Sequence, residues 1–217
     1  MSVAATSLLL DLDGTLIDSK PGIMESYRFA AQAVLPGVAF DPAAVAVGPP
    51  LPEMFRKSFP NATGAQQKSL TTAFRGHYAR EGLFKTTLFD GVTEVLARCR
   101  QSGINLYIAT NKPLHLSISI LDHLKIAGFF RSVVAIDSVK PPFAGKAAMI
   151  RHLLNAHQVS ASDAIYVGDT EGDAEAAEAC GMRFIWAAFG YGKLSPHRLK
   201  SAFKTIQNFS DLGKIFE

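Results

Sequence analysis

The stretch that decides the fold is an apolar run that ends in two acids, a glycine and a threonine. It reads Ser7-Leu8-Leu9-Leu10-Asp11-Leu12-Asp13-Gly14-Thr15. A short run that is apolar almost throughout is typical of a strand covered on both faces. We therefore expect a buried strand over 7–12 that brings the carboxylates of Asp11 and Asp13 to one end of a sheet. Acids at a strand end are also common turn formers, so this pair alone leaves both interpretations open.

Further apolar runs follow from residue 84 onward, and segments with helical periodicity separate them. The other expected strands cover 104–110, 132–136, 164–167 and 183–186. Strands that alternate with amphipathic helices predict a parallel sheet with crossover helices. We predict an α/β fold with a Rossmann-like three-layer core and five parallel strands.

Residues 20–83 differ from the rest of the chain, because helical segments follow one another there with no strand between them. The expected helices cover 21–34, 51–58 and 64–81. This pattern predicts a helical cap subdomain at 20–83, inserted into an α/β core formed by 1–19 and 84–217. The chain returns to the core near 88–91, where we expect Asp90 to cap the next helix.

The composition is that of an ordinary globular chain. Its 217 residues are 48% apolar and 19% charged, and 22 basic against 19 acidic side chains leave a net charge of +3. That excess is far below the dense basic face of a nucleic-acid binder. No apolar run approaches the roughly 20 residues of a membrane span. We expect no nucleic-acid or membrane partner, and either a monomer or a homodimer.

The start of the chain and its cysteines indicate a cytoplasmic protein. Residues 1–10 lack the basic beginning of a secretory signal peptide, and their apolar run ends at Asp11. Cys99 and Cys180 are too few and too far apart for a disulfide framework or a thiolate metal site.

Three further motifs carry residues suited to phosphate or metal binding. The segment 110–113 brings the hydroxyl of Thr110 and backbone amides to the start of a helix, a position that attracts anions. Lys146 stands directly before the apolar stripe of another helix. The segment 167–173 ends a strand in Asp169 and places Asp173 one helical turn later. Taken singly, these are also an ordinary helix cap, a solvated lysine and a capping acid.

In this order, the four motifs resemble those of the haloacid dehalogenase-like hydrolase superfamily. Asp-x-Asp-Gly-Thr at 11–15 and Gly-Asp-x-x-x-Asp at 168–173 are specific in combination. The similarity covers nearly the whole chain, and the helical insertion matches the small α-helical cap of that superfamily. The stretches 11–19, 48–51 (Gly-Pro-Pro-Leu) and 89–92 also resemble the phosphoglycolate phosphatase branch.

The resemblance implies roles for the residues that would handle the phosphoryl group. Asp11 would attack phosphorus and form an aspartyl phosphate. Asp13 would protonate the leaving alcohol and then activate water. The remaining catalytic or substrate-binding positions are Gly14, Thr110, Asn111 and Lys146.

The resemblance also implies a Mg²⁺ site made of Asp11, Asp13, Asp169 and Asp173. Asp13 would contribute its backbone carbonyl, and Asp173 would orient Lys146 or a metal-bound water. Oxygen ligands favour Mg²⁺ over Zn²⁺.

The lysine of this superfamily has two candidates in the chain. Lys140 lies 29 residues and Lys146 lies 23 residues before Asp169. Relatives commonly carry the lysine about 25 residues before the matching acid, and Lys146 begins its helix directly. We expect Lys146 to be the catalytic lysine.

The expected activity is Mg²⁺-dependent hydrolysis of small phosphate monoesters, phosphoglycolate-like or nucleotide monophosphates. A sugar phosphomutase of the same superfamily and a non-catalytic module that binds a phosphorylated metabolite remain alternatives. Asp13 argues against dehalogenation, because the dehalogenases of the superfamily do not use this second acid. At the end of the chain, we expect a solvated edge helix within the basic stretch 193–204 and a last short helix within 209–216.

Overall fold

The structure is a computed structural model that describes residues 5–39, 45 and 51–215. The chain divides into two compact units. One consists of Met1–Asp18 and Leu88–Glu217, and the other of Ser19–Thr87. The sequence predicts the first boundary one residue later and the second four residues earlier.

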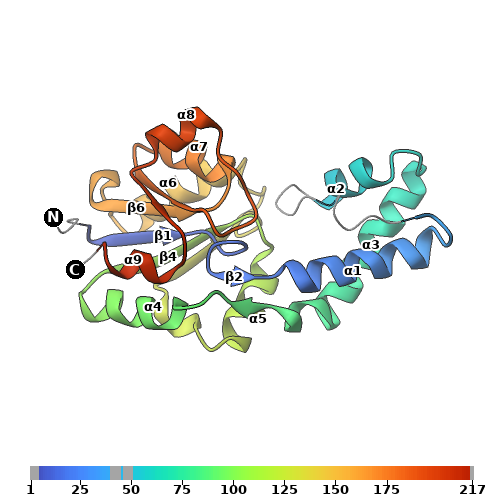
Figure 1. The fold of residues 1–217 in the computed structure, drawn as a ribbon, viewed down its shortest axis with the longest axis horizontal. Helices are drawn as coiled ribbons and strands as arrows, with labels where there is room; N and C mark the ends of the chain where they lie inside the picture. The colour runs from blue at the N-terminus through green and yellow to red at the C-terminus, as the bar shows by residue number, and fades with distance from the viewer. Residues whose placement is uncertain (1–4, 40–44, 46–50, 216–217) are drawn as a thin grey trace. The chain divides into compact units, whose positions relative to one another are not determined.

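A six-stranded sheet forms the centre of the first unit (Figure 1). Its strands are β1 (Ser7–Leu10), β4 (Asn105–Thr110), β5 (Ser132–Ala135), β6 (Ala164–Gly168), β7 (Arg183–Ala187) and β8 (Lys204–Ile206). Their order is β5-β4-β1-β6-β7-β8, and each neighbouring pair is parallel. The predicted α/β fold with a parallel core is confirmed.

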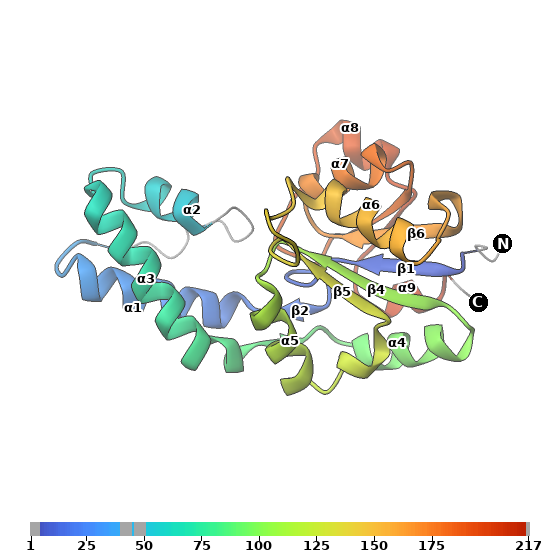
Figure 2. The same ribbon diagram turned by 180° about the vertical axis from the view of Figure 1, so that it is seen from behind.

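Helices cover both faces of this sheet, as Figure 2 shows from the opposite side. One face carries α4 (Val92–Gln101), α5 (Leu114–His123) and α9 (Ser210–Gly213), and the other carries α6 (Lys146–Ala156) and α7 (Glu171–Ala179). On the α6 side, side chains of the central strands, among them Leu9 and Tyr166, pack with Met149 and Leu153. The strands are therefore buried on both faces, which explains their continuous apolar runs.

The basic stretch 193–204 contains the predicted exposed helix, but it also leads into a sixth strand that the sequence did not predict. It holds a short helix, α8 (Pro196–Ser201), and then enters β8, which pairs with β7 at the edge of the sheet. Only Ile206 of the three residues in β8 is buried. A strand this short, with one buried side chain, has no period that a sequence could reveal. The predicted short helix near the end of the chain corresponds to α9.

The expected cap of α4 is also wrong. The N-cap residue is Gly91, with φ +81°, and no side chain caps the helix. A capping side chain belongs to the N-cap residue itself. Asp90 stands one position too early, and the left-handed turn at Gly91 starts the helix instead.

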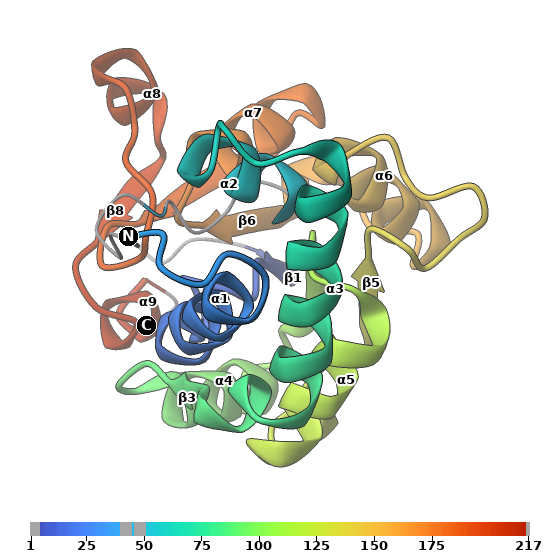
Figure 3. The same ribbon diagram turned by 90° about the vertical axis from the view of Figure 1, so that its right-hand side faces the viewer.

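The second unit contains three helices, α1 (Lys20–Val34), α2 (Leu51–Ser58) and α3 (Gly64–Arg80). Helix α3 packs along α1, as Figure 3 shows. The core of this unit contains an aromatic cluster, formed by Tyr27, Phe55, Phe59, Phe74 and Tyr78. Residues 48–50, from the stretch that resembles the phosphoglycolate phosphatase branch, lie outside the described residues.

Short elements complete the description. Strands β2 (Ile17–Asp18) and β3 (Thr87–Leu88) form a two-stranded sheet. Turns of 3₁₀ helix occur at η2 (Gly82–Lys85), η3 (Ala127–Phe129) and η4 (Ala161–Asp163). None of the helices in the described part of the chain has the length and apolar character of a membrane span.

Candidate active site

The parallel register places three of the motifs at one edge of the sheet. Leu10 of β1 pairs with Ile108 of β4 and with Val167 of β6. Asp11 directly follows Leu10, and its backbone N–H donates to the carbonyl of Val167 at 2.9 Å. Because parallel strands end at the same side, Asp11 meets the residues that end β4 and follow β6.

A tight turn follows Asp11 and returns the chain toward β2. The N–H groups of Leu16 and Ile17 donate to the carbonyl of Leu12 at 3.0 and 3.1 Å. Gly14 has φ +81°, and a Cβ at this position would lie 2.4 Å from Oδ2 of Asp169. A glycine is therefore required both by the backbone conformation and by the close approach of the turn to Asp169.

Three carboxylates meet beside this turn. Asp11, Asp169 and Asp173 each offer an oxygen, and these oxygens lie within 4.8 Å of one another. All three residues are buried. Burial raises the pKa of Asp11 to about 8 against the opposing charge of Lys146, with Asp173 and Asp169 adding to the rise. Burial also raises the pKa of Asp169 to about 6, and the nearby charge of Asp173 contributes. Ionisation of these carboxylates therefore costs free energy, and a bound cation would compensate that cost.

Lys146, the first residue of α6, supplies the positive charge of the cluster. Its Nζ lies 2.9 Å from Oδ1 of Asp11 and 2.5 Å from Oδ1 of Asp173. Its side chain is 9% exposed. Burial alone would lower the pKa of Lys146, but the two carboxylates together raise it above its usual value. The competing candidate, Lys140, is exposed.

Asp173 also stabilises the start of α7. Thr170 is the N-cap residue: its Oγ1 accepts from the N–H of Asp173 at 3.3 Å, and its own N–H donates to Oδ2 of Asp173 at 3.0 Å. Tyr166, buried in β6, donates its hydroxyl to Oδ1 of Asp173 at 3.3 Å. The alternative reading of Asp169 as the helix cap is therefore wrong, and Asp173 combines capping with its contact to Lys146.

Asp13 lies outside the three-carboxylate cluster. Its Oδ1 pairs with Nζ of Lys112 at 2.7 Å, and the Lys112 side chain is only 7% exposed. Thr110 is buried, and its Oγ1 accepts from the backbone N–H of Lys112 at 3.1 Å. The structure thus brings together the carboxylates of three of the four predicted metal residues and gives the carboxylate of Asp13 a separate partner. Sequence reasoning did not select Lys112, although it stands inside the quoted motif at 110–113.

The alternative interpretation of that motif, a helix cap, does not hold. The N-cap residue of α5 is Pro113, and the N–H of Leu114 donates instead to Oδ1 of Asp137 at 2.8 Å. The side chain of Asn111 is exposed. Neither Thr110 nor Asn111 is therefore committed to capping.

The two carboxylate oxygens of Asp169 differ in their hydrogen bonds. Oδ2 accepts from the backbone N–H groups of Tyr191 at 2.7 Å and Gly192 at 3.2 Å. Oδ1 is buried and has no hydrogen-bond partner among the described residues. A buried carboxylate oxygen that lacks a partner is costly unless a ligand satisfies it. Sequence reasoning missed the loop 190–192, whose signal is a Gly-x-Gly shortly after an apolar strand.

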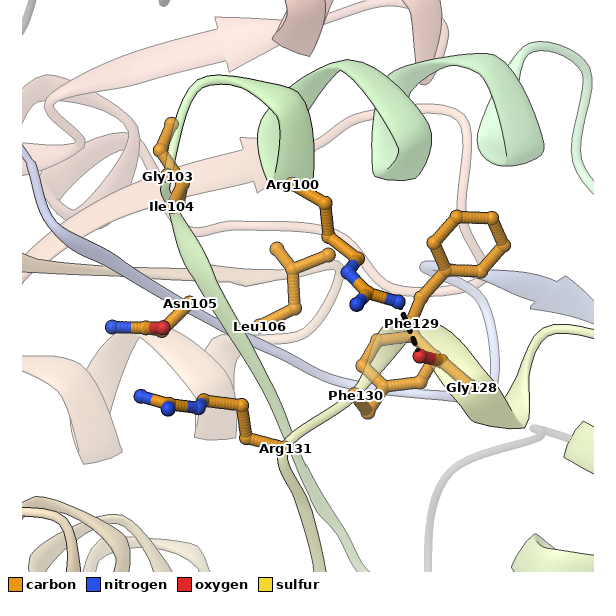
Figure 4. Close-up of a pocket in the computed structure, with 9 residues that line it drawn as sticks. All are labelled: Arg100, Gly103, Ile104, Asn105, Leu106, Gly128, Phe129, Phe130 and Arg131. Carbon is orange, nitrogen blue, oxygen red and sulfur yellow. Dashed lines mark hydrogen bonds between the residues drawn. The ribbon is translucent and has the colours of Figure 1, made fainter.

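A pocket of about 280 Å³ lies at the opposite, amino edge of the sheet (Figure 4). Its lining residues are Arg100, Gly103, Ile104, Asn105, Leu106, Gly128, Phe129, Phe130 and Arg131. The guanidinium of Arg100 donates to the carbonyl of Gly128 at 2.6 Å. None of the predicted site residues lines this pocket.

The fold and the three buried carboxylates identify the class of protein. It is an α/β enzyme whose active site lies at the carboxyl ends of parallel strands. The chain belongs to the haloacid dehalogenase-like hydrolase family, whose model matches residues 8–187. The predicted superfamily and the predicted hydrolase of the phosphoglycolate phosphatase type are confirmed.

Individual relatives agree with this assignment. The chain is 32% identical over 198 residues to a phosphoglycolate phosphatase (plasmid) of Cupriavidus necator, covering 88% of this chain and 84% of that protein. It is 29% identical over 218 residues to a 5'-nucleotidase of Pseudomonas aeruginosa, covering 97% and 95%. A haloacid dehalogenase-like family hydrolase from Streptococcus pneumoniae superposes with a TM-score of 0.86 at 25% identity, over 99% of each chain.

Proposed function

We propose that the protein is a Mg²⁺-dependent phosphatase that hydrolyses small phosphate monoesters through an aspartyl phosphate on Asp11. The observation that carries this proposal is Oδ1 of Asp169. This oxygen is buried without a partner among the described residues, and Asp169 belongs to a cluster of three carboxylates. A hard cation with oxygen ligands would satisfy it.

The donor set fits Mg²⁺ better than a softer metal, because every side-chain ligand in the cluster is a carboxylate oxygen. Asp11, Asp169 and the backbone carbonyl of Asp13 would hold the ion, with Asp173 beside them. When bound, Mg²⁺ supplies positive charge that reduces the repulsion between the carboxylates and a phosphate dianion.

Asp11 acts as the nucleophile in this proposal. Its carboxylate attacks phosphorus, the bond from phosphorus to the ester oxygen breaks, and the phosphoryl group is transferred to Asp11. Lys146, 2.9 Å from Oδ1 of Asp11, balances the charge that develops on the phosphoryl oxygens. Asp173 holds Lys146 in this position. Thr110 and the backbone amide of Asn111 bind phosphoryl oxygens, and Gly14 allows the turn to approach the site.

Asp13 acts as the general acid and base. It donates a proton to the leaving alcohol oxygen and then accepts a proton from the water that attacks the aspartyl phosphate, which regenerates Asp11 and releases phosphate. The contact with Lys112 holds the Asp13 carboxylate apart from the metal-binding cluster. This separation supports a proton-transfer role for Asp13, in contrast to the nucleophilic role of Asp11.

The experiment that tests the proposal is phosphate release from a panel of monoesters, with Mg²⁺ and with a chelator. The names of the two relatives make 2-phosphoglycolate and nucleoside 5'-monophosphates the first members of the panel. We expect release that requires Mg²⁺ and disappears in Asp11→Asn. Absence of release from every monoester, in a protein that is folded and supplied with Mg²⁺, would contradict the proposal. Conversion of glucose 1-phosphate to an isomer without net release of phosphate would instead identify a phosphomutase.

A further inference from the structure

The loop Gly190-Tyr191-Gly192 closes around Asp169. The backbone N–H groups of Tyr191 and Gly192 both donate to Oδ2 of Asp169. The indole Nε1 of Trp186, in β7, donates to the backbone carbonyl of Asp169 at 3.1 Å. Asp169 is thus held through its backbone and through one carboxylate oxygen, while the other oxygen remains without a partner among the described residues.

The glycines of this loop are required by close packing. A Cβ on Gly192 would lie 2.4 Å from the backbone carbonyl oxygen of Asp169 and 2.8 Å from Cα of Thr170. A Cβ on Gly190 would lie 2.3 Å from Cβ of Asp169. These neighbours are backbone atoms or the first atom of a side chain, so they cannot move away without displacing Asp169.

The side chain of Tyr191 attaches the same loop to the first motif. Its hydroxyl donates to Oδ1 of Asp18 at 2.7 Å, and it lies 3.5 Å from the carbonyl oxygen of Ile17. Both partners belong to β2, directly after the turn that begins at Asp11. A single residue thus contacts Asp169 through its backbone N–H and the end of the first motif through its hydroxyl.

We infer that Gly190-Tyr191-Gly192 is the positioning element for metal binding by Asp169. The two N–H groups fix Oδ2 and with it the orientation of the carboxylate, which leaves Oδ1 as the oxygen available to the ion. The hydrogen bond from the Tyr191 hydroxyl to Asp18 holds the loop beside the end of the first motif. This inference rests on the proposed Mg²⁺ site and assigns the loop a part in forming it. Residues that orient a metal ligand typically contribute about 10- to 100-fold to metal affinity.

The test compares Mg²⁺ affinity, measured by titration calorimetry, in wild type, Gly192→Ala and Tyr191→Phe. We expect the dissociation constant to rise about 10- to 100-fold in Gly192→Ala. Tyr191→Phe keeps both N–H groups and loses only the hydroxyl, so we expect a smaller rise of about 3- to 10-fold. Gly128→Ala is the matched control, because its Cβ would meet no atom within 4 Å, and its affinity should stay within about twofold of wild type.

The outcomes distinguish a failure of the inference from a failure of the proposed function. Circular dichroism in chelator first shows which variants are folded. If Gly192→Ala fails to fold, Tyr191→Phe serves as the test, because it loses only a single oxygen. Folded variants that bind Mg²⁺ within twofold of wild type would overturn the role of the loop while leaving the proposed function intact. Wild type that binds no Mg²⁺ would overturn the proposed function and the inference built on it.

Discussion

The carboxyl edge of the sheet and the core of the helical unit bury side chains of opposite character. At the carboxyl edge of the sheet, the buried polar residues include Asp11, Thr110, Asp169 and Asp173. In the helical unit, Tyr27 stacks on Phe55 with ring centroids 4.3 Å apart, and Phe74 packs edge-on to both at 6.4 and 6.2 Å. Aromatic burial stabilises a fold directly, whereas buried charges cost free energy unless partners compensate them. The aromatic core of the helical unit therefore stabilises the fold. The carboxyl edge of the sheet costs folding free energy and is suited to chemistry.

The largest expected effect is on activity, at the carboxylate edge. Asp11→Asn removes the nucleophile, so we expect phosphate release to fall by more than about 10⁴-fold. The amide has nearly the same shape and no charge, so the variant should remain folded in the absence of metal. Phosphate release and thermal unfolding in chelator, measured on the same preparation, check both halves of the prediction.

Asp13→Asn is the matched control for that change. It keeps the nucleophile and removes the proton-transfer group, so some aspartyl phosphate should form and decay slowly. Trapping of ³²P on the protein after mixing with labelled substrate distinguishes the two variants. Near-wild-type turnover in both would contradict the division of roles between Asp11 and Asp13.

The next effect is on stability, in the aromatic core. Phe55 is fully buried, so Phe55→Ala should lower the free energy of unfolding by about 3–5 kcal/mol. The control is Phe84→Ala in the same unit, where the ring is 55% exposed and the change should stay within about 0.5 kcal/mol. Denaturant unfolding followed by circular dichroism measures both. Equal losses in the two variants would mean that the aromatic cluster does not stabilise the helical unit as its burial indicates.

The same contrast explains how much the sequence reveals. β1 is continuously apolar and stops at Asp11, so its position and its functional end could both be predicted. β8 could not, because one buried side chain in three residues gives no periodic signal. The partners of Asp13 and Tyr191 were equally hidden, since Lys112 is 99 residues from Asp13 and Tyr191 is 173 residues from Asp18. Such contacts exist only after the strands have been ordered into a sheet.

Asp173 shows a different limit of sequence reasoning. Its spacing from Asp169 marks it as unusual, but an acid at the third position of a helix is also an ordinary capping partner. In the structure it does both, with Oδ2 on Thr170 and Oδ1 on Lys146. The spacing of Asp173 from Asp169 is compatible with helix capping and with a contact to a catalytic lysine. The sequence alone therefore cannot show which of the two roles Asp173 has.

A third prediction compares the two lysines. Lys146→Ala removes the cation that lies between Asp11 and Asp173, so turnover should fall about 10²- to 10³-fold, whereas Lys140→Ala should change it less than about twofold. Removing one partner of a buried ion pair also leaves uncompensated charge. Lys146→Ala should therefore lower the melting temperature in chelator, and Lys140→Ala should not. A larger loss of turnover in Lys140→Ala would reverse the assignment of the catalytic lysine.

The smallest effect expected is the pH dependence of stability in the absence of metal. The pKa values of Asp11 and Asp169 are raised to about 8 and about 6, from ordinary values near 3.8. The folded state therefore holds these protons more tightly than the unfolded chain does. Their contribution to stability is fully present below a pH of about 3.8 and declines above it, until it is lost above about 6 for Asp169 and about 8 for Asp11.

In chelator, the melting temperature should consequently fall as the pH is raised from 5.5 to 8.5. Asp11→Asn removes one of the two titrations and should flatten the dependence. Added Mg²⁺ should raise the melting temperature more at pH 8.5 than at pH 5.5, because the ion binds ionised carboxylates and competes with protons for them. A wild-type curve that rises with pH in chelator would mean that Lys146 alone compensates the buried carboxylates. The charged edge would then resemble the aromatic core in stabilising the fold without a ligand.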